Sequence, residues 1–283
     1  MTLIDAIGLV LHPRRDCGPV MDTIANWARS RDIKVFGLAE ETERVRGTVT
    51  PVDAARLGDV DLLVSLGGDG TMLRAMKLAF TRRTPVLGVN LGRLGFLAEI
   101  DPPELADALL AIDEHRFTIE PRSGLRAAIG DKEAIAFNDI ALARVPGNGM
   151  AAVQLHVEGH PFVRYSADAV VVATPTGSTA YSFSAGGPIV SPTTEGLLIT
   201  PVAPHSTFNR AVFLSSGEKL ALEVTGGELG VEADGRLIGH VRAGTVIDIE
   251  VLSAAASVVR LGRTTFYQRV QRKFGLIGDH TTG

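Results

Sequence analysis

The first 120 residues alternate between short apolar runs and segments whose apolar residues recur at helical spacing. The apolar runs, each of strand length, span residues 3–11, 33–38, 61–66 and 85–91. The helical segments span residues 20–30, 72–80 and 102–112. Continuous apolar strands that alternate with amphipathic helices predict an α/β domain, in which helices cover both faces of a parallel sheet.

After residue 120 the pattern changes to a succession of short β-rich runs. They span residues 134–145, 151–157, 162–165, 169–173, 219–224 and 246–251. Residues 266–277 return to helical spacing, with Phe266, Val270 and Phe274 on one face. Strands that follow βα units predict a second, mainly β domain. We expect an α/β domain over 1–118, a β-rich domain over 119–263 and a terminal helix in 264–283.

Composition and charge narrow the class of protein. The 283 residues are 45% hydrophobic and 21% charged, which is typical of a soluble globular protein of two domains. A formal net charge of −4 with no dense basic block argues against a nucleic-acid partner. The single cysteine, Cys17, excludes an intrachain disulfide or a multi-cysteine metal site. No apolar run approaches membrane-spanning length, so we expect a cytoplasmic protein with no membrane partner.

Residues 67–71, Gly-Gly-Asp-Gly-Thr, follow an apolar run and precede a helical segment. Glycines let the backbone turn sharply and approach a ligand closely, and amide groups beside a helix N-terminus suit a phosphate. Asp69 carries a negative charge, so it is better suited to accept a proton from a hydroxyl or to hold a metal. Together these features predict phosphoryl transfer. The alternative interpretation is an ordinary tight turn.

Residues 174–188 (TPTGSTAYSFSAGGP) follow the buried-looking run 169–173. Small hydroxyl and glycine residues at 176–179 can surround a flat polar ring, and Tyr181 offers a ring for stacking. The alternative is a flexible Gly/Ser/Thr loop, although Pro175, Phe183 and Pro188 disfavour free flexibility. We therefore interpret the segment as a nucleotide-binding surface.

Several other nucleotide chemistries lack their signatures. The chain has neither the G-x-x-x-x-G-K-[ST] loop of P-loop enzymes nor the motif set of protein kinases. No G-x-G-x-x-G follows the first strand, which argues against a hydride-transferring dehydrogenase. The seven histidines show no metal-ligand spacing, so a zinc site is not expected.

Four motifs in this order resemble the bacterial-type NAD kinases, which phosphorylate the 2′-hydroxyl of the adenosine ribose of NAD to give NADP. They are residues 67–71, 88–97 (GVNLGRLGFL), 138–139 (Asn-Asp) and 174–188, and the resemblance spans nearly the whole chain. It implies an α/β N-terminal domain, a β-rich NAD-binding C-terminal domain and a last helix that packs back on the N-terminal domain. It also implies a divalent metal such as Mg²⁺, ATP or polyphosphate as phosphoryl donor, and a homodimer or homotetramer.

The resemblance assigns roles residue by residue. Asp69 would orient and deprotonate the 2′-hydroxyl, Gly70 would hold the backbone close to the dinucleotide, and Phe96 would pack near the nicotinamide riboside. Asn138 and Asp139 would bind ribose hydroxyls and adenine.

Further residues would contact the nucleotide. Asp168 would do so from the other domain, with a contact across a subunit interface left open. The expected lining of the adenine and ribose pocket is Thr176, Thr179, Ala180, Tyr181 and Ser184. No dedicated metal ligands are expected.

The chain departs from the family at a few positions. Asp168 stands between Ala167 and Ala169, where glycines are common, and Ala173 replaces a common serine. Asp139 stands where many members carry Glu. Residues 233–236 (ADGR) match a family stretch near the nicotinamide end.

Two alternative functions remain at this stage. Diacylglycerol- and sphingosine-type lipid kinases share a GGDGT-like loop, but their P-x-G-T-x-N-D-like segment has no counterpart in residues 85–93. A non-catalytic NAD(P)-binding sensor would keep the fold, yet a pure binder does not need Asp69. We therefore expect an NAD kinase.

Overall fold

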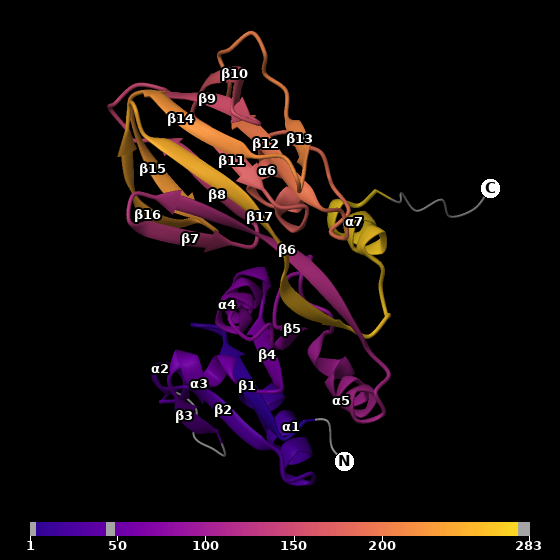
Figure 1. The fold of residues 1–283 in the computed structure, drawn as a ribbon. Coiled ribbons are helices and arrows are strands. Elements are labelled where there is room, and N and C mark those ends of the chain that lie inside the picture. Colours follow the sequence, from indigo (N-terminus) through magenta and orange to yellow (C-terminus); the bar gives the residue numbers. More distant parts are fainter. Residues whose placement is uncertain (1–3, 44–48, 277–283) are drawn as a thin grey trace, which may run out of the picture. The chain divides into compact units, whose positions relative to one another are not determined.

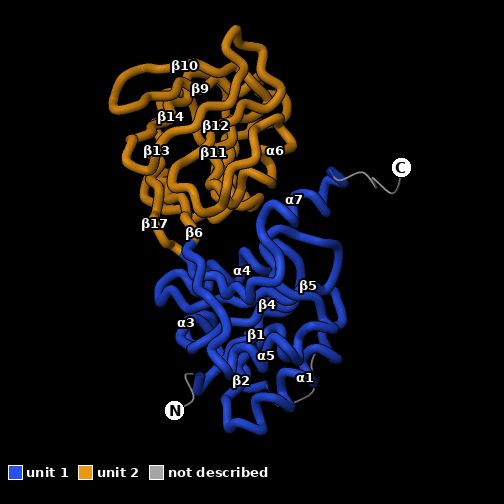
Figure 2. The backbone as a smooth tube through the Cα atoms, turned by 90° about the vertical axis from the view of Figure 1, so that its right-hand side faces the viewer, with its two compact units in different colours: residues 1–121, 256–283 blue, residues 122–255 orange. Residues whose placement is uncertain are grey.

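The computed structural model describes residues 4–43 and 49–276. The chain divides into two compact units, unit 1 with residues 1–121 and 256–283, and unit 2 with residues 122–255 (Figure 2). These divisions differ from the expected 118/119 and 263/264 because β6 (Thr118–Ile129) and β17 (Val246–Arg260) each continue through a division. Within the described residues, no helix is long and apolar enough to cross a bilayer.

Unit 1 is built on a parallel sheet with the strand order β5-β4-β1-β2-β3, and the end of β17 pairs with β5 in parallel (Figure 1). Its strands are β1 (Ala6–Leu11), β2 (Lys34–Leu38), β3 (Thr50–Val52), β4 (Leu62–Gly67) and β5 (Pro85–Asn90). β1 and β4 are buried along their whole length, as strands covered on both faces must be. The predicted parallel α/β sheet is confirmed.

Helices cover the two faces of this sheet. α1 (Gly18–Arg29) and α5 (Leu105–Asp113) pack with Leu9 and Val64 in one apolar core. On the other face, Leu57 of α3 (Ala54–Gly58) lies over Gly8, and Met72 of α4 (Asp69–Ala79) lies over Gly88. Two short helices, α2 (Ala39–Thr42) and η1 (Pro102–Glu104), complete the helices before β6.

Unit 2 contains two antiparallel arrays of strands around a shared core. One array joins β10 (His160–Ala167), β9 (Ala151–Val157), β14 (Leu220–Gly226) and β17, to which the hairpin of β6 and β7 (Lys132–Ala136) is added. The second sheet has the order β13-β12-β11-β8-β15-β16. Its strands are β8 (Asp139–Arg144), β11 (Ala169–Ala173), β12 (Gly196–Val202), β13 (Val212–Ser215), β15 (Glu228–Ala233) and β16 (Arg236–Arg242).

The outer face of the second sheet carries the helical turns of unit 2. A small apolar cluster that includes Val171 and Leu198 faces away from the main core. The 3₁₀ helix η2 (Thr176–Thr179) and helix α6 (Tyr181–Ser184) lie against β11 and β12. The predicted β-rich second part of the chain is therefore confirmed.

The C-terminal helix is also confirmed, as α7 (Phe266–Phe274), although its predicted end, Ile277, lies outside the described residues. Its residues Phe266 and Phe274 pack against Phe96 of unit 1, at ring-centroid distances of 6.4 and 5.8 Å. The sequence pattern missed β3, β6, β12, β13, β15 and β16, and it gave β7 and β8 as one run. Most of these strands lack the clear alternation or the continuous apolar run by which a strand is recognised.

Candidate functional site

Asp69 is the first residue of α4, and only Gly68 separates it from β4, a strand inside the parallel sheet of unit 1. The C-terminal ends of such strands form the edge at which α/β sheets bind ligands. The first turn of the helix also presents amide groups without a helical partner and the positive end of the helix dipole. Asp69 is half-buried there, so its carboxylate is both constrained and accessible.

Two backbone amides fix the carboxylate of Asp69. The N–H of Phe96 donates to Oδ2 and the N–H of Leu97 donates to Oδ1, both at 3.0 Å. A Cβ on Gly95 would lie 2.2 Å from Oδ1, so only glycine allows this approach. Each carboxylate oxygen has a second lone pair. Asp69 is thus oriented by the loop and can still accept a proton from a hydroxyl.

The glycines around Asp69 supply space. None of Gly67, Gly68 and Gly70 has a positive φ, so the turn from β4 into α4 does not depend on a left-handed glycine conformation. A Cβ on Gly67 would lie 2.2 Å from Oγ1 of the buried Thr71. A Cβ on Gly68 or Gly70 would meet nothing within 4 Å. Backbone at these two positions is open to a closely approaching ligand.

A basic segment at the end of β1 was not identified from the sequence. His12 Nδ1 accepts hydrogen bonds from the backbone amides of Arg14 (3.1 Å) and Arg15 (3.0 Å), and Arg15 donates to the carbonyl of Leu91 after β5. Burial, followed by Arg15, Arg14 and Arg74, lowers the pKa of His12, which favours the neutral ring that these hydrogen bonds require. The position of His-Pro-Arg-Arg directly after the first strand was the available signal.

In unit 2, the turn that carries Asn138 and Asp139 is held by Asp234. The carboxylate Oδ1 of Asp234 accepts the amides of Phe137 (3.1 Å), Asn138 (2.7 Å) and Asp139 (3.3 Å), and the Asp234 amide donates to the carbonyl of Asp139 (2.9 Å). Asp234 itself has a positive φ of 48°. The Ala-Asp-Gly-Arg stretch therefore has a clear structural task, to orient the Asn138 turn.

The turn at Asn138 is hydrogen-bonded to the 174–188 segment. Thr174 donates its amide to the carbonyl of Asn138 (2.8 Å) and its hydroxyl to the carbonyl of Phe137 (2.6 Å). The hydroxyl of Thr174 also accepts the amide of Gly177 (2.9 Å). A Cβ on Gly177 would lie 2.0 Å from the carbonyl oxygen of Asn138, so the two backbones touch. The flexible-loop alternative is excluded.

These contacts bring most of the predicted unit 2 residues together. Asp139 and Thr176 are buried, Asn138, Thr179 and Ala180 are half-buried, and Tyr181 and Ser184 are exposed. Burial raises the pKa of the Tyr181 hydroxyl, and Glu232, Asp139 and Asp168 raise it further. Carboxylates near this hydroxyl can accept hydrogen bonds from ribose hydroxyls or from an amino group.

Asp168 lies apart from the Asn138 turn. It precedes β11, whereas Thr174 follows it, and five residues of strand span about 16 Å. Its carboxylate accepts a hydrogen bond from Arg144 Nε at 2.6 Å and is nearly half exposed. Asp168 belongs to the same unit as Asn138. Its negative charge is one of those that raise the pKa of Tyr181, which connects it to the other predicted residues.

We predict that Asp234→Ala destabilises the protein by about 1–3 kcal/mol and weakens binding of NAD, the ligand that the resemblance implies, because three amides lose a charged acceptor. Thermal unfolding and calorimetric titration with NAD measure the two effects. Asp131→Ala, at an exposed turn of unit 2, is the matched control and should change neither. Unchanged NAD affinity in Asp234→Ala would contradict the role of this carboxylate.

The residues present fit a magnesium ion that is held mainly by phosphates. No group of three His, Cys, Asp or Glu side chains in residues 4–43 and 49–276 is arranged to hold a metal. Mg²⁺ usually keeps several waters and takes one or two carboxylates together with substrate phosphates. Asp69, with one free lone pair on each oxygen, is the carboxylate in unit 1 that suits this role.

Family models match both parts of the chain. Residues 21–117 match the ATP-NAD kinase N-terminal domain, and residues 137–261 match the ATP-NAD kinase C-terminal domain. The chain is 35% identical to NAD kinase 1 of Streptomyces avermitilis over 314 residues, which covers 96% of this chain and 88% of that protein.

Two solved structures are similar over nearly the whole chain. An NAD kinase from Archaeoglobus fulgidus, solved in complex with ATP, is 27% identical with a TM-score of 0.75, covering 96% of this chain and 100% of that one. A yeast NADH kinase complexed with NADH has a TM-score of 0.85 at 23% identity, covering 99% of this chain and 89% of that one, and shows the shared fold.

Proposed function

The chain belongs to the ATP-NAD kinase family and is an NAD kinase, and we propose that Asp69 is its catalytic base. The observation that carries the proposal is the fixed carboxylate of Asp69 at the N-terminus of α4. Asp69 accepts the proton of the 2′-hydroxyl of the adenosine ribose as that oxygen attacks the γ-phosphorus of ATP. The new O–P bond forms as the bond to ADP breaks, and NADP results.

A ribose hydroxyl is a poor nucleophile at neutral pH, so a positioned base contributes roughly 10²–10⁴-fold to the rate. Most of the remaining acceleration comes from alignment and from groups that stabilise charge on the transferred phosphoryl group. The open backbone at Gly68 and Gly70 gives phosphate oxygens close access to amides. Arg14 and Arg15, at the end of β1, supply positive charge at the same edge of the unit 1 sheet.

Mg²⁺ bound to the donor would neutralise phosphate charge, and Asp69 is the side chain that would hold it. The protein's own part is to orient this carboxylate and to present amides and arginines to the donor. ATP is the donor that the relationship to the Archaeoglobus fulgidus enzyme supports, since that enzyme was solved with ATP.

Unit 2 supplies the residues that bind NAD. Asn138 and Asp139 bind ribose hydroxyls and adenine, and Asp168 contacts the nucleotide as a further acceptor. The adenine and ribose are lined by Thr176, Thr179, Ala180, Tyr181 and Ser184. The half-buried or exposed state of Asn138, Thr179 and Tyr181 supports this assignment, because a ligand can reach them.

Four further assignments depend on the family relationship. Gly70 holds the backbone close to the dinucleotide, which its open surroundings support. Phe96 lies near the nicotinamide riboside, with its ring packed on α7. The protein works in the cytoplasm as a homodimer or homotetramer, as the resemblance to the family implies.

The alternatives gain no support. The relatives described above are NAD or NADH kinases, which does not favour a lipid kinase. A sensor that only binds NAD(P) has no use for a carboxylate held as Asp69 is.

Donor and metal choice can be tested in one experiment. Purified protein is incubated with NAD and either ATP or polyphosphate, each with Mg²⁺ or with EDTA, and NADP is measured with an NADP-specific dehydrogenase. We expect NADP from ATP with Mg²⁺ and none with EDTA. NADP formed with polyphosphate but not with ATP would contradict the donor assignment. NADP formed with ATP in the presence of EDTA, in undiminished amount, would contradict the metal assignment.

A further inference from the structure

One peptide group joins Asp69 to the C-terminal helix. The N–H of the Phe96–Leu97 peptide donates to Oδ1 of Asp69 at 3.0 Å. The carbonyl of the same peptide, that of Phe96, accepts a hydrogen bond from Nη1 of Arg269 at 3.2 Å. Hydrogen bonds at both ends of a peptide group polarise it and strengthen one another. The guanidinium of Arg269 therefore acts on the carboxylate of Asp69 through one peptide.

Cations of the C-terminal segment bind four carbonyl groups in the stretch 94–98, that of Phe96 and three others. The additional carbonyl contacts are Lys273 Nζ with Leu94, Arg269 Nη1 with Ala98 (2.8 Å) and Arg260 Nη1 with Leu97 (3.4 Å). The Lys273 ammonium also lies 5.8 Å from the centre of the Phe96 ring. The carbonyl groups of this stretch thus bind the C-terminal segment, while the amides of Phe96 and Leu97 bind Asp69.

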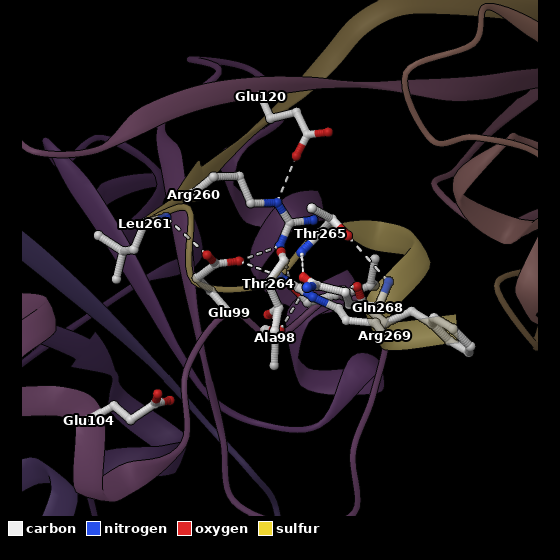
Figure 3. A network of polar contacts seen from close by, with 12 residues as sticks. Ala98, Glu99, Glu104, Glu120, Arg260, Leu261, Thr264, Thr265, Gln268 and Arg269 are labelled. Carbon is white, nitrogen blue, oxygen red and sulfur yellow. Dashed lines mark hydrogen bonds and ion pairs between the residues drawn. The ribbon is translucent and has the colours of Figure 1, made fainter. Parts of the chain in front are cut away.

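A buried ion pair fixes the guanidinium itself. Arg269 is 4% exposed and Glu99 is 6% exposed, and their side chains form an ion pair (Figure 3). Glu99 is also bound by Arg260 Nη1 (2.8 Å) and the amide of Leu261 (2.9 Å), and Arg260 is bound by Glu120 (2.7 Å). A buried charge pair keeps one geometry when its remaining donors and acceptors are satisfied, as they are here.

The start of α7 is equally defined. Thr265 caps the helix by accepting the amide of Gln268 (3.2 Å), and the Gln268 side chain accepts the amide of Thr265 (2.8 Å). This reciprocal cap sets the first turn and so the direction in which Arg269 leaves the helix. The network ties a residue near the C-terminus to the loop that orients Asp69.

We propose that Arg269 is a positioning residue for phosphoryl transfer. Its guanidinium holds the Phe96–Leu97 peptide against Asp69 and thereby sets the direction of the carboxylate. This inference rests on the catalytic role proposed for Asp69. The residue acts through the peptide group, so its removal changes turnover more than substrate affinity.

The test compares the steady-state kinetics of variants of the full chain. Arg269→Ala is expected to lower kcat by roughly 10- to 100-fold, since small misplacements of reacting groups have effects of this size, with KM for NAD within about twofold. Arg269→Lys keeps a cation but lacks the planar fork that reaches two carbonyls and a carboxylate, so it recovers part of kcat.

Two controls on the same helix separate positioning from stability. Val270→Ala removes buried apolar contacts of α7 and lowers the unfolding temperature, but leaves the Phe96–Leu97 peptide bound, so kcat is retained. Arg272→Ala removes an exposed arginine and is expected to match the wild type in both measurements. Arg269→Ala leaves the buried Glu99 carboxylate without one of its partners, and this variant will not fold if that loss is too costly. In that case Glu99→Gln/Arg269→Met removes the same donors without leaving a buried carboxylate, and it is expected to show the same loss of kcat.

The double variant Asp69→Asn/Arg269→Ala completes the test. If Arg269 acts through Asp69, the double variant is no slower than Asp69→Asn alone. Wild-type kcat in folded Arg269→Ala, or an equal loss of kcat in Val270→Ala, would overturn the positioning role while leaving the proposed function intact. Wild-type turnover in Asp69→Asn alone would instead refute the catalytic role proposed for Asp69.

Discussion

Asp69→Asn is expected to lower NADP formation by roughly 10²–10⁴-fold while NAD binding largely survives. Asparagine keeps the size of the side chain but cannot take the proton of the 2′-hydroxyl. In the wild type, two backbone amides donate to the Asp69 carboxylate. In the variant, the side-chain NH₂ of asparagine faces one of these amides, so the loop at Phe96 and Leu97 loses one acceptor. NADP formation is measured with an NADP-specific dehydrogenase, and NAD binding by calorimetric titration.

Asp22→Asn, an exposed position on α1 of the same unit, is the matched control and should retain wild-type kinetics. The prediction concerns kcat, because removal of a base that acts in the transition state leaves ground-state binding unchanged. Full turnover in Asp69→Asn would show that another group accepts the proton, or that no base is needed.

The second large effect is expected from Gly177→Ala. The added methyl group would lie 2.0 Å from the carbonyl oxygen of Asn138 and 2.5 Å from its carbonyl carbon, so backbone must move on one side. Overpacking of this kind costs about 1–3 kcal/mol. Because the displaced turn carries Asn138 and Asp139, we expect NAD affinity to fall by roughly 10- to 100-fold.

Calorimetric titration with NAD and thermal unfolding measure the consequences of Gly177→Ala. Gly217→Ala is the matched control in unit 2, since a Cβ there meets nothing within 4 Å and the residue has no positive φ. Wild-type NAD affinity in Gly177→Ala would mean that the contact between η2 and the Asn138 turn does not shape the binding surface.

Local patterns were sufficient for the main architecture. The apolar runs that became β1, β4 and β5 are continuous because helices cover both faces of their sheet. The Gly-Gly-Asp-Gly-Thr motif correctly placed Asp69 at the transition from a strand to a helix, because strand, turn and helix signals coincide there, and Asp69 is the first residue of α4. The 174–188 segment was recognised for a similar reason, since it directly follows the buried β11.

The hydrogen-bond partners that hold these motifs in place could not be predicted from the local sequence pattern. Asp69 is bound by amides 27 and 28 positions later, Asn138 by a carboxylate 96 positions later, and Phe96 by an arginine 173 positions later. Backbone amides and carbonyls carry no sequence signal of their own, so the partners of Asp69 and Arg269 appear only in the folded chain. Gly95 and Gly177 are informative only once their neighbours are known.

The most direct test of the central claim is NADP formation by the wild-type protein. Purified protein with NAD, ATP and Mg²⁺ should accumulate NADP with time, in proportion to the amount of protein, while titration shows NAD binding. Measurable NAD binding without NADP from ATP or from polyphosphate would contradict the account and would favour a protein that only senses the dinucleotide.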